Sequence, residues 1–194
     1  HQDYLTSKKN IKCLQGSLNL TQAISYYKNK LLIGTGTCFE YKMSSKILFP
    51  DSPENPSCLY AETKLAFKDI TKQLLELGNN RFIWARIFFL FGENESPKRL
   101  YPMIMHALET DQVLELTSGK QIRDFLHIDK AAQIIVAQLF SKSNFEIVNV
   151  CSGQGQSVKE FAINLVNERS YLLKFGVRKN NLVDPPIIVG HPKK

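Results

Sequence analysis

Ser57-Cys58-Leu59-Tyr60-Ala61-Glu62-Thr63-Lys64 is the stretch around which the rest of the chain can be arranged. It opens a segment with helical periodicity, and Ser57 is a residue type favoured at the N-cap of a helix. Because Tyr60 and Lys64 are four residues apart, their side chains lie on one face of that helix. An ammonium group beside a phenol stabilises the phenolate, so the two residues form a plausible acid/base pair. The same spacing occurs by chance on solvated helices, so the surrounding sequence has to decide its meaning.

Helix-like and strand-like segments alternate on both sides of this stretch. Apolar residues at helical spacing over 10–28 predict a helix, and the apolar run Leu31–Gly34 predicts a buried strand. The helix that begins at Ser57 is expected to continue to about Leu77 and to end at Gly78. The same patterns predict a loop over 42–56, one strand over 81–91, a helix over 100–109 and two short strands within 112–125. They further predict a helix over 129–140 capped by Asp129, a strand over 145–150 and a helix that begins at Ser157. This alternation is typical of an α/β fold with a mainly parallel sheet.

Composition and charge limit the class of protein. The chain has 194 residues, of which 43% are hydrophobic, enough for one ordinary domain or the larger part of a bigger one. Its formal charge is +7, but the basic residues are scattered, so nucleic-acid binding is not favoured. The four cysteines lie far apart without ligand spacing, which argues for free thiols and against a metal site. With no apolar run of about 18 residues to span a membrane, we expect a cytoplasmic protein.

Two glycine pairs invite comparison with the dinucleotide-binding fingerprint. Gly34-Thr35-Gly36 follows a predicted strand, but Phe39 stands where the third glycine would be, and a proline-bearing loop follows instead of a helix. Gly153-Gln154-Gly155 also lacks the third glycine and is better explained as a turn between a strand and a helix. Neither pair is therefore interpreted as a phosphate-binding loop.

Thr37 gives the Tyr60 helix its most informative context. It lies just after the strand predicted at Leu31–Gly34 and four residues before Tyr41, at the edge of an open α/β sheet where ligands collect. This arrangement, followed by Tyr60 and Lys64, resembles the extended short-chain dehydrogenase/reductase family, also called the NAD-dependent epimerase/dehydratase family. Four further stretches resemble motifs of that family in the same order: Arg86-Ile87-Phe88-Phe89-Leu90-Phe91-Gly92, Arg99-Leu100-Tyr101-Pro102, Gly119-Lys120-Gln121-Ile122-Arg123-Asp124-Phe125-Leu126-His127-Ile128-Asp129 and Val148-Asn149-Val150-Cys151-Ser152-Gly153.

The resemblance assigns roles to individual residues. Tyr60 would exchange a proton with a sugar hydroxyl or keto group, and Thr37 would hydrogen-bond that oxygen and so touch the substrate. Lys64 would lower the pKa of Tyr60 and, together with Tyr60, contact the nicotinamide ribose of NAD or NADP. Arg123 would pair with the diphosphate of a nucleotide sugar, and Arg99 would also bind substrate.

Some of these residues also have a structural interpretation. Arg123 could instead be a surface arginine paired with Asp124. His127 and Asn149 are expected to be structural, and Asp129 is expected to cap a helix.

The resemblance also implies an architecture, namely a partial Rossmann-like, doubly wound parallel sheet with a smaller C-terminal substrate-binding region. Residues 1–92 would be the C-terminal part of an NAD(P)-binding domain that carries the catalytic residues. Residues 93–194 would mostly bind the nucleotide sugar, with 122–150 returning to the core sheet. Helices over 11–24 and 65–77 would mediate a homodimer.

Departures from the family pattern refine the expected function. Cys38-Phe39 stands where 4,6-dehydratases have Asp-Glu, so an epimerase or a 4-ketoreductase is favoured over a dehydratase. Phe89 stands where many relatives carry an asparagine that touches the substrate phosphates. The glycine-rich unit with which relatives begin is not recognised in this sequence. An alternative is therefore a truncated or degenerate homologue that binds a nucleotide sugar, or acts as a scaffold, without catalysis.

Overall fold

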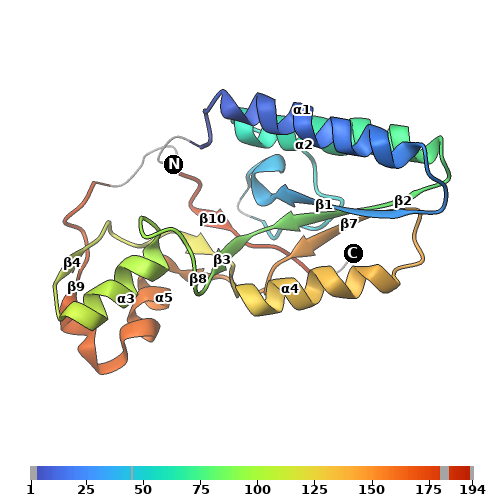
Figure 1. Ribbon diagram of the computed structural model, residues 1–194. Coiled ribbons are helices and arrows are strands. Elements are labelled where there is room, and N and C mark those ends of the chain that lie inside the picture. The colour runs from blue at the N-terminus through green and yellow to red at the C-terminus, as the bar shows by residue number, and fades with distance from the viewer. Residues whose placement is uncertain (1–3, 45, 180–183, 193–194) are drawn as a thin grey trace.

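The computed structural model describes residues 4–44, 46–179 and 184–192 and has an α/β fold (Figure 1). Its central sheet has the strand order β1-β2-β7, and both strand pairs are parallel. The strands are β1 (Leu31–Thr37), β2 (Arg81–Ile87) and β7 (Phe145–Val150). Helices α1 (Lys9–Ser25) and α2 (Leu59–Glu76) cover one face of this sheet. Helix α4 (Ile128–Ala137) covers the other face. Helices on both faces confirm the expected doubly wound arrangement.

A smaller lobe lies beside the carboxyl ends of these strands, at the left of Figure 1. It is built from α3 (Leu100–Thr110), α5 (Val158–Val166), the paired strands β4 (Leu114–Glu115) and β9 (Leu173–Lys174), and the 3-10 turn Asn167–Leu172. Two short sheets connect it to the central sheet. They are β3 (Phe89–Phe91) with β6 (Phe125–His127), and β10 (Ile187–Ile188), β5 (Ile122–Arg123) and β8 (Gln156–Ser157).

Trp84 on β2 explains the two glycines of β1. A Cβ atom added at Gly34 would lie 2.7 Å from the Trp84 ring, and one at Gly36 would lie 2.5 Å from its indole nitrogen. Both glycines therefore make room for a fully buried tryptophan. This finding agrees with the rejection of a phosphate-binding loop at Gly34-Thr35-Gly36.

The expected start of the Tyr60 helix was wrong by one residue, whereas its expected end is confirmed: α2 ends at Glu76, Leu77 is its C-cap and Gly78 follows. The N-cap is Cys58, not Ser57, and it makes no side-chain capping bond, because the backbone carbonyl of Leu5 accepts the N–H of Tyr60 at 2.9 Å. At the other end, Asn79 rather than Gly78 adopts positive φ. A glycine is still needed at 78, since an added Cβ would lie 2.6 Å from the Asn80 side chain.

Two other expectations on local structure also required correction. The N-cap of α4 is His127, whose Nδ1 accepts the backbone N–H of Asp129 at 3.3 Å, so Asp129 lies in the first turn instead of capping it. The segment 81–91 was expected to be one strand but contains two, β2 and β3, that belong to different sheets and are separated by Phe88. The two short strands expected within 112–125 are present as β4 and β5; β4 pairs with β9, and β5 pairs with β8 and β10.

Candidate active site

Thr37 is held in place by a turn that its own sequence encodes. It is the last residue of β1 and the N-cap of the 3-10 turn Cys38–Glu40. Its backbone N–H donates to Oε1 of Glu40 at 2.7 Å, and its hydroxyl accepts the N–H of Phe39 at 3.4 Å. This reciprocal capping box fixes the direction in which the Thr37 hydroxyl leaves the strand.

Glu40 is fully buried beneath this turn. Its Oε2 accepts the indole N–H of Trp84 at 2.8 Å and Nε of Arg86 at 2.8 Å. Arg86 also pairs with Glu54 and lies 4.2 Å from the centre of the Tyr41 ring. The carboxylate is thus fully committed to structure, and it anchors the turn to the middle strand of the sheet.

Tyr60 and Lys64 lie in the first two turns of α2 and face the Thr37 turn. Burial, the largest cause, and nearby Tyr4, Cys38 and Glu40 together raise the pKa of Tyr60 to about 12, although the Thr37 side chain acts to lower it. Tyr60 is therefore protonated at neutral pH.

The ammonium of Lys64 donates to the backbone oxygen of Thr35 at 2.9 Å and lies 5.9 Å from the centre of the Tyr60 ring. Burial lowers the pKa of Lys64. The expectation that Lys64 lowers the pKa of Tyr60 is not met in this arrangement, because the pKa of the phenol is raised and its causes do not include Lys64.

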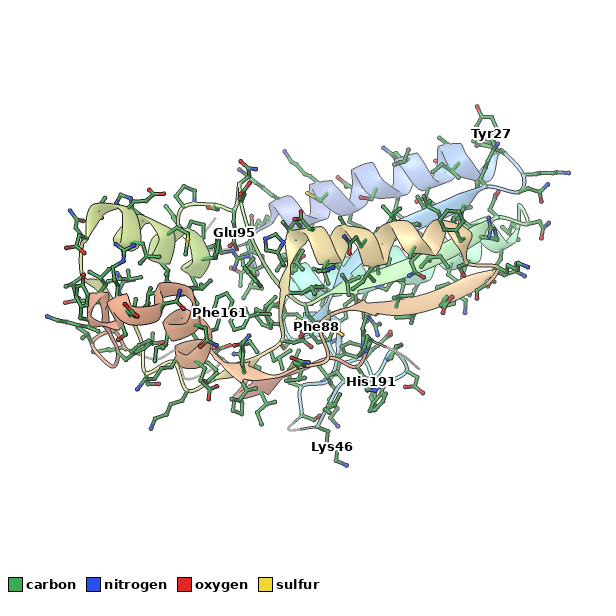
Figure 2. All side chains as sticks on the ribbon, turned by 90° about the horizontal axis from the view of Figure 1, so that it is seen from below. Tyr27, Lys46, Phe88, Glu95, Phe161 and His191 are labelled. Atoms are coloured by element: carbon green, nitrogen blue, oxygen red, sulfur yellow. The ribbon has the colours of Figure 1, made fainter. Side chains whose placement is uncertain are left out.

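A cavity of about 340 Å³ opens above these residues, between the central sheet and the smaller lobe. Thr37, Tyr60, Lys64 and Arg99 all contribute to its lining. Figure 2 shows Glu95 and Phe161, which also line it, where the α3 and α5 lobe meets the sheet. The fold thus brings four of the five predicted site residues to one concave surface of a size typical for small-molecule sites.

Arg123, the fifth predicted site residue, lies outside this cavity. It is buried, with 3% of its surface exposed, and its Nη2 lies 2.6 Å from Oδ1 of Asp184. Its guanidinium is 5.3 Å from the ring centre of Phe89, a residue that does line the cavity. The interpretation of Arg123 as a surface residue paired with Asp124 was wrong, because Asp124 instead accepts the backbone N–H groups of Ser152 and neighbouring residues.

Sequence reasoning missed two polar residues of the cavity. The ring of Tyr4 packs edge-on against Tyr60, with 5.2 Å between ring centres, and the guanidinium of Arg99 lies 5.4 Å from the Tyr4 ring. Oε1 of Glu95 lies 3.8 Å from Nε of Arg99. The four-residue spacing of Glu95 and Arg99 was a usable signal, whereas nothing in the sequence around Tyr4 indicated its place in the site.

Sequence reasoning also missed a continuous set of aromatic rings, which we call the aromatic wall. Its members all line the cavity: Phe39, Phe89, Phe91, Tyr101, Phe125 and Phe161. Successive ring centres are separated by 6.2 Å (Phe39 to Phe89), 6.2 Å (Phe89 to Phe125), 3.9 Å (Phe125 to Phe161), 5.0 Å (Phe161 to Phe91) and 5.6 Å (Phe91 to Tyr101). The cavity therefore joins one polar group of side chains to one aromatic surface.

Lys64 and Tyr60 also fit the ribose of a nicotinamide cofactor. A second cavity, of about 360 Å³, meets the first at Thr35, Tyr60 and Lys64. An ammonium has three N–H donors, and the bond to Thr35 uses one of those on Lys64, so the donor set fits a ribose hydroxyl. Gly34 is packed on Trp84, so this segment does not offer a cradle for the cofactor's diphosphate.

Known proteins share both the sequence pattern and the fold of this chain. The model of the NAD dependent epimerase/dehydratase family matches residues 7–151. The chain belongs to this family. Like other members, it has the Rossmann-like fold: a UDP-N-acetylglucosamine 4-epimerase from Methanobrevibacter ruminantium M1, solved with UDP-N-acetylmuramic acid, superposes with a TM-score of 0.80 at 18% identity. That match covers 91% of this chain and 59% of the epimerase.

Two further proteins are similar to this chain, one in structure and one in sequence. The dTDP-glucose 4,6-dehydratase DesIV from Streptomyces venezuelae, solved with NAD bound, has a TM-score of 0.78 at 17% identity and matches 92% of this chain and 56% of its own. CDP-abequose synthase of Salmonella typhimurium (strain LT2) is 26% identical over 112 residues, which are 56% of this chain and 38% of the synthase. The chain spans 27 to 48% of the length of the curated relatives that it matches.

Over residues 4–44, 46–179 and 184–192, His, Cys, Asp and Glu side chains do not form a group of three or more that could hold a metal ion. All four cysteines are free thiols, as expected. The helices in the described part of the chain are too short or too polar to cross a bilayer.

Proposed function

We propose that this chain forms the catalytic and nucleotide-sugar-binding part of an NAD(P)-dependent oxidoreductase, an epimerase or 4-ketoreductase in preference to a 4,6-dehydratase. The observation that carries the proposal is that Thr37, Tyr60 and Lys64, from β1 and α2, all line one cavity. In this proposal residues 1–92 belong to the cofactor-binding domain, and residues 93–194 mostly bind the sugar nucleotide, with 122–150 returning to the sheet.

The chemistry assigned to each residue follows from its protonation and position. The nicotinamide supplies the hydride or accepts it. Tyr60, protonated with a pKa of about 12, donates its proton to a carbonyl oxygen of the sugar as that oxygen gains charge. Thr37 hydrogen-bonds the same oxygen, and Lys64 contributes a positive charge and a donor to a ribose hydroxyl. Because the phenol is held protonated, ketone reduction is the direction in which this site needs the least change.

The assignment against dehydration rests on the residues after Thr37. Cys38 is 2% exposed, and burial raises the pKa of its thiol to about 12, so it does not supply a carboxylate for elimination of water. Glu40, the acidic residue of the same turn, is bound to Trp84 and Arg86 below the cavity floor. The acid/base pair that elimination requires is therefore not built at this position.

Two arginines are proposed to meet the anionic part of the substrate. Arg99 lines the cavity, and its side chain is 57% exposed, so it can bind a phosphate oxygen without leaving a buried position. Arg123 can do so only after its ion pair with Asp184 opens. We therefore assign the first contact to Arg99.

A homodimer in the cytoplasm is proposed for the complete protein. Ile70 and Leu77 on the outer side of α2 are 47% and 87% exposed, and they line a shallow apolar hollow with Leu74. Sedimentation equilibrium on the purified protein, with Ile70→Glu as a variant, tests this proposal. A monomer at all concentrations would contradict it.

Replacement of Tyr60 by Phe tests the proposed reaction. The complete protein is incubated with NAD or NADP and a panel of nucleotide sugars, and change in reduced nicotinamide is recorded. Tyr60→Phe is expected to lower kcat by about 10²- to 10⁴-fold, the usual contribution of a general acid. Tyr26→Phe, at an 80% exposed tyrosine after α1, is the matched control and should leave kcat unchanged. Full turnover by Tyr60→Phe would refute the proposal, and binding of sugar nucleotides without turnover by the unaltered protein would favour a binding or scaffold protein.

A further inference from the structure

The aromatic wall begins next to the proposed reacting centre. Phe39 follows Thr37 by two residues in the same turn, and its ring packs edge-on against Phe89, with 6.2 Å between centres. Both side chains line the cavity that contains Tyr60. A substrate bound in this cavity with an oxygen at Thr37 and Tyr60 would therefore have Phe39 and Phe89 among the side chains available to its sugar ring.

Polar and aromatic side chains are segregated in this cavity. The Tyr4 ring contacts both the Tyr60 ring and the Arg99 guanidinium, and Glu95 pairs with Arg99. The rings of the aromatic wall contact one another in an unbroken series that ends at Tyr101, whose hydroxyl is the only oxygen on a wall side chain. The near end of the wall, at Phe39 and Phe89, consists of hydrocarbon.

Contacts outside the cavity and contacts between the rings hold the aromatic wall in place. The Arg123 guanidinium lies 5.3 Å from the centre of the Phe89 ring and outside the cavity. Phe125 and Phe161 stack at 3.9 Å with an angle of 10° between their planes. Because these two faces cover each other, the wall is a fixed apolar surface and not an open slot for a stacked base.

A sugar hydroxyl placed against such a surface loses its hydrogen bonds to water and gains none in return. A methyl group in the same place gains from leaving water and adds no unpaired polar atom. We propose that the nucleotide sugar is a 6-deoxyhexose derivative, whose methyl group beside the reacting carbon packs against Phe39 and Phe89. This inference rests on the proposed function and specifies its substrate class.

The test compares substrates that differ only at this carbon. The complete protein is assayed with pairs of nucleotide sugars that share the nucleotide and the ring configuration, one with a methyl group and one with a hydroxymethyl group at carbon 6. The 6-deoxy member should have a kcat/KM about 10- to 100-fold higher, the range in which a hydrophobic pocket discriminates against one added hydroxyl. Equal kcat/KM values, or preference for the hydroxymethyl sugar, would overturn the inference while leaving the proposed reaction intact. Turnover of neither member of any pair would remove the proposed function itself, and the inference with it.

Two variants locate the discrimination on the wall. Phe89→Asn places a hydrogen-bonding amide at the near end and should bring the ratio of the two kcat/KM values toward one. Phe39→Tyr adds a single hydroxyl at nearly constant volume and should act in the same direction, which provides a second measurement if Phe89→Asn folds poorly. Phe140→Asn makes the same exchange at a residue that is 83% exposed and outside the cavity, and it should leave the ratio unchanged. If Phe39→Tyr and a folded Phe89→Asn both keep the ratio of the two kcat/KM values as high as in the unaltered protein, the aromatic wall has no role in the discrimination.

Discussion

Replacement of Glu40 by Gln is the most informative perturbation of this fold. Its two carboxylate oxygens accept three hydrogen bonds, from the Thr37 backbone, the Trp84 indole and Arg86, at 2.7, 2.8 and 2.8 Å. A glutamine amide has one oxygen and one NH2 group. In either orientation the NH2 group therefore points at an N–H donor, that of Thr37 or those of Trp84 and Arg86, and at least one of the three hydrogen bonds is lost. The variant also leaves the buried guanidinium of Arg86 without this carboxylate.

The cost follows from these contacts. Breaking a buried ion pair by removing one partner costs about 3–5 kcal/mol of unfolding free energy. Such a loss is a large part of the roughly 5–15 kcal/mol that stabilises a typical protein. Urea denaturation of the complete protein, followed by circular dichroism, measures the difference. Glu168→Gln, at an exposed carboxylate of the smaller lobe, is the control and should change the unfolding free energy by less than about 0.5 kcal/mol.

The same variant has an electrostatic consequence at the active site. Burial is the main cause of the raised pKa of Tyr60, and the negative charge of Glu40 adds to it. Removing that charge lowers the pKa of Tyr60, so a rate that needs the protonated phenol should fall at lower pH in Glu40→Gln than in the unaltered protein. A loss of stability below about 1 kcal/mol, or a shift of this limb to higher pH, would refute the role given to Glu40.

Three further perturbations test separate parts of the structure. Ser157→Ala removes the capping box of α5 and should cost about 1 kcal/mol of unfolding free energy in the same denaturation assay; an unchanged midpoint would contradict that cap. Gly36→Ala places a methyl group 2.5 Å from the indole nitrogen of Trp84, and the resulting overpacking should cost about 1–3 kcal/mol; a fully stable variant would show that β1 can move away from the indole. Because burial raises the pKa of the Cys38 thiol to about 12, iodoacetamide at neutral pH should modify the exposed Cys13 well before Cys38, as peptide mass mapping can show; equal modification would mean that the Thr37 turn opens in solution.

The fold was largely predictable because its elements carry strong periodic signals. The buried strands β1 and β7 and the helices α1 and α3 lie close to their expected ranges. The boundary at Ser57 was missed because a carbonyl far away in the chain, that of Leu5, performs the capping. Local patterns cannot reveal a partner that is supplied by tertiary structure.

The candidate site was predictable only in part, for a similar reason. The spacing of Tyr60 and Lys64 on one helix indicated their common face, and the fold brings Thr37 to them. The aromatic wall comes from a 3-10 turn, two strands and two helices, and each of its rings alone resembles an ordinary core residue. The burial of Arg123 depends on Asp184, 61 positions further along the chain, and no spacing rule covers such a pair.

The position of Trp84 makes the protein convenient to observe. It is the only tryptophan in the sequence, and its indole N–H is bonded to the carboxylate that holds the Thr37 turn. Tryptophan fluorescence, excited selectively over the tyrosines, therefore comes from a single indole located under the proposed reacting centre. Disturbance of the turn by a ligand, by pH or by mutation should change the wavelength or intensity of that emission, without any added label and in the unmodified protein.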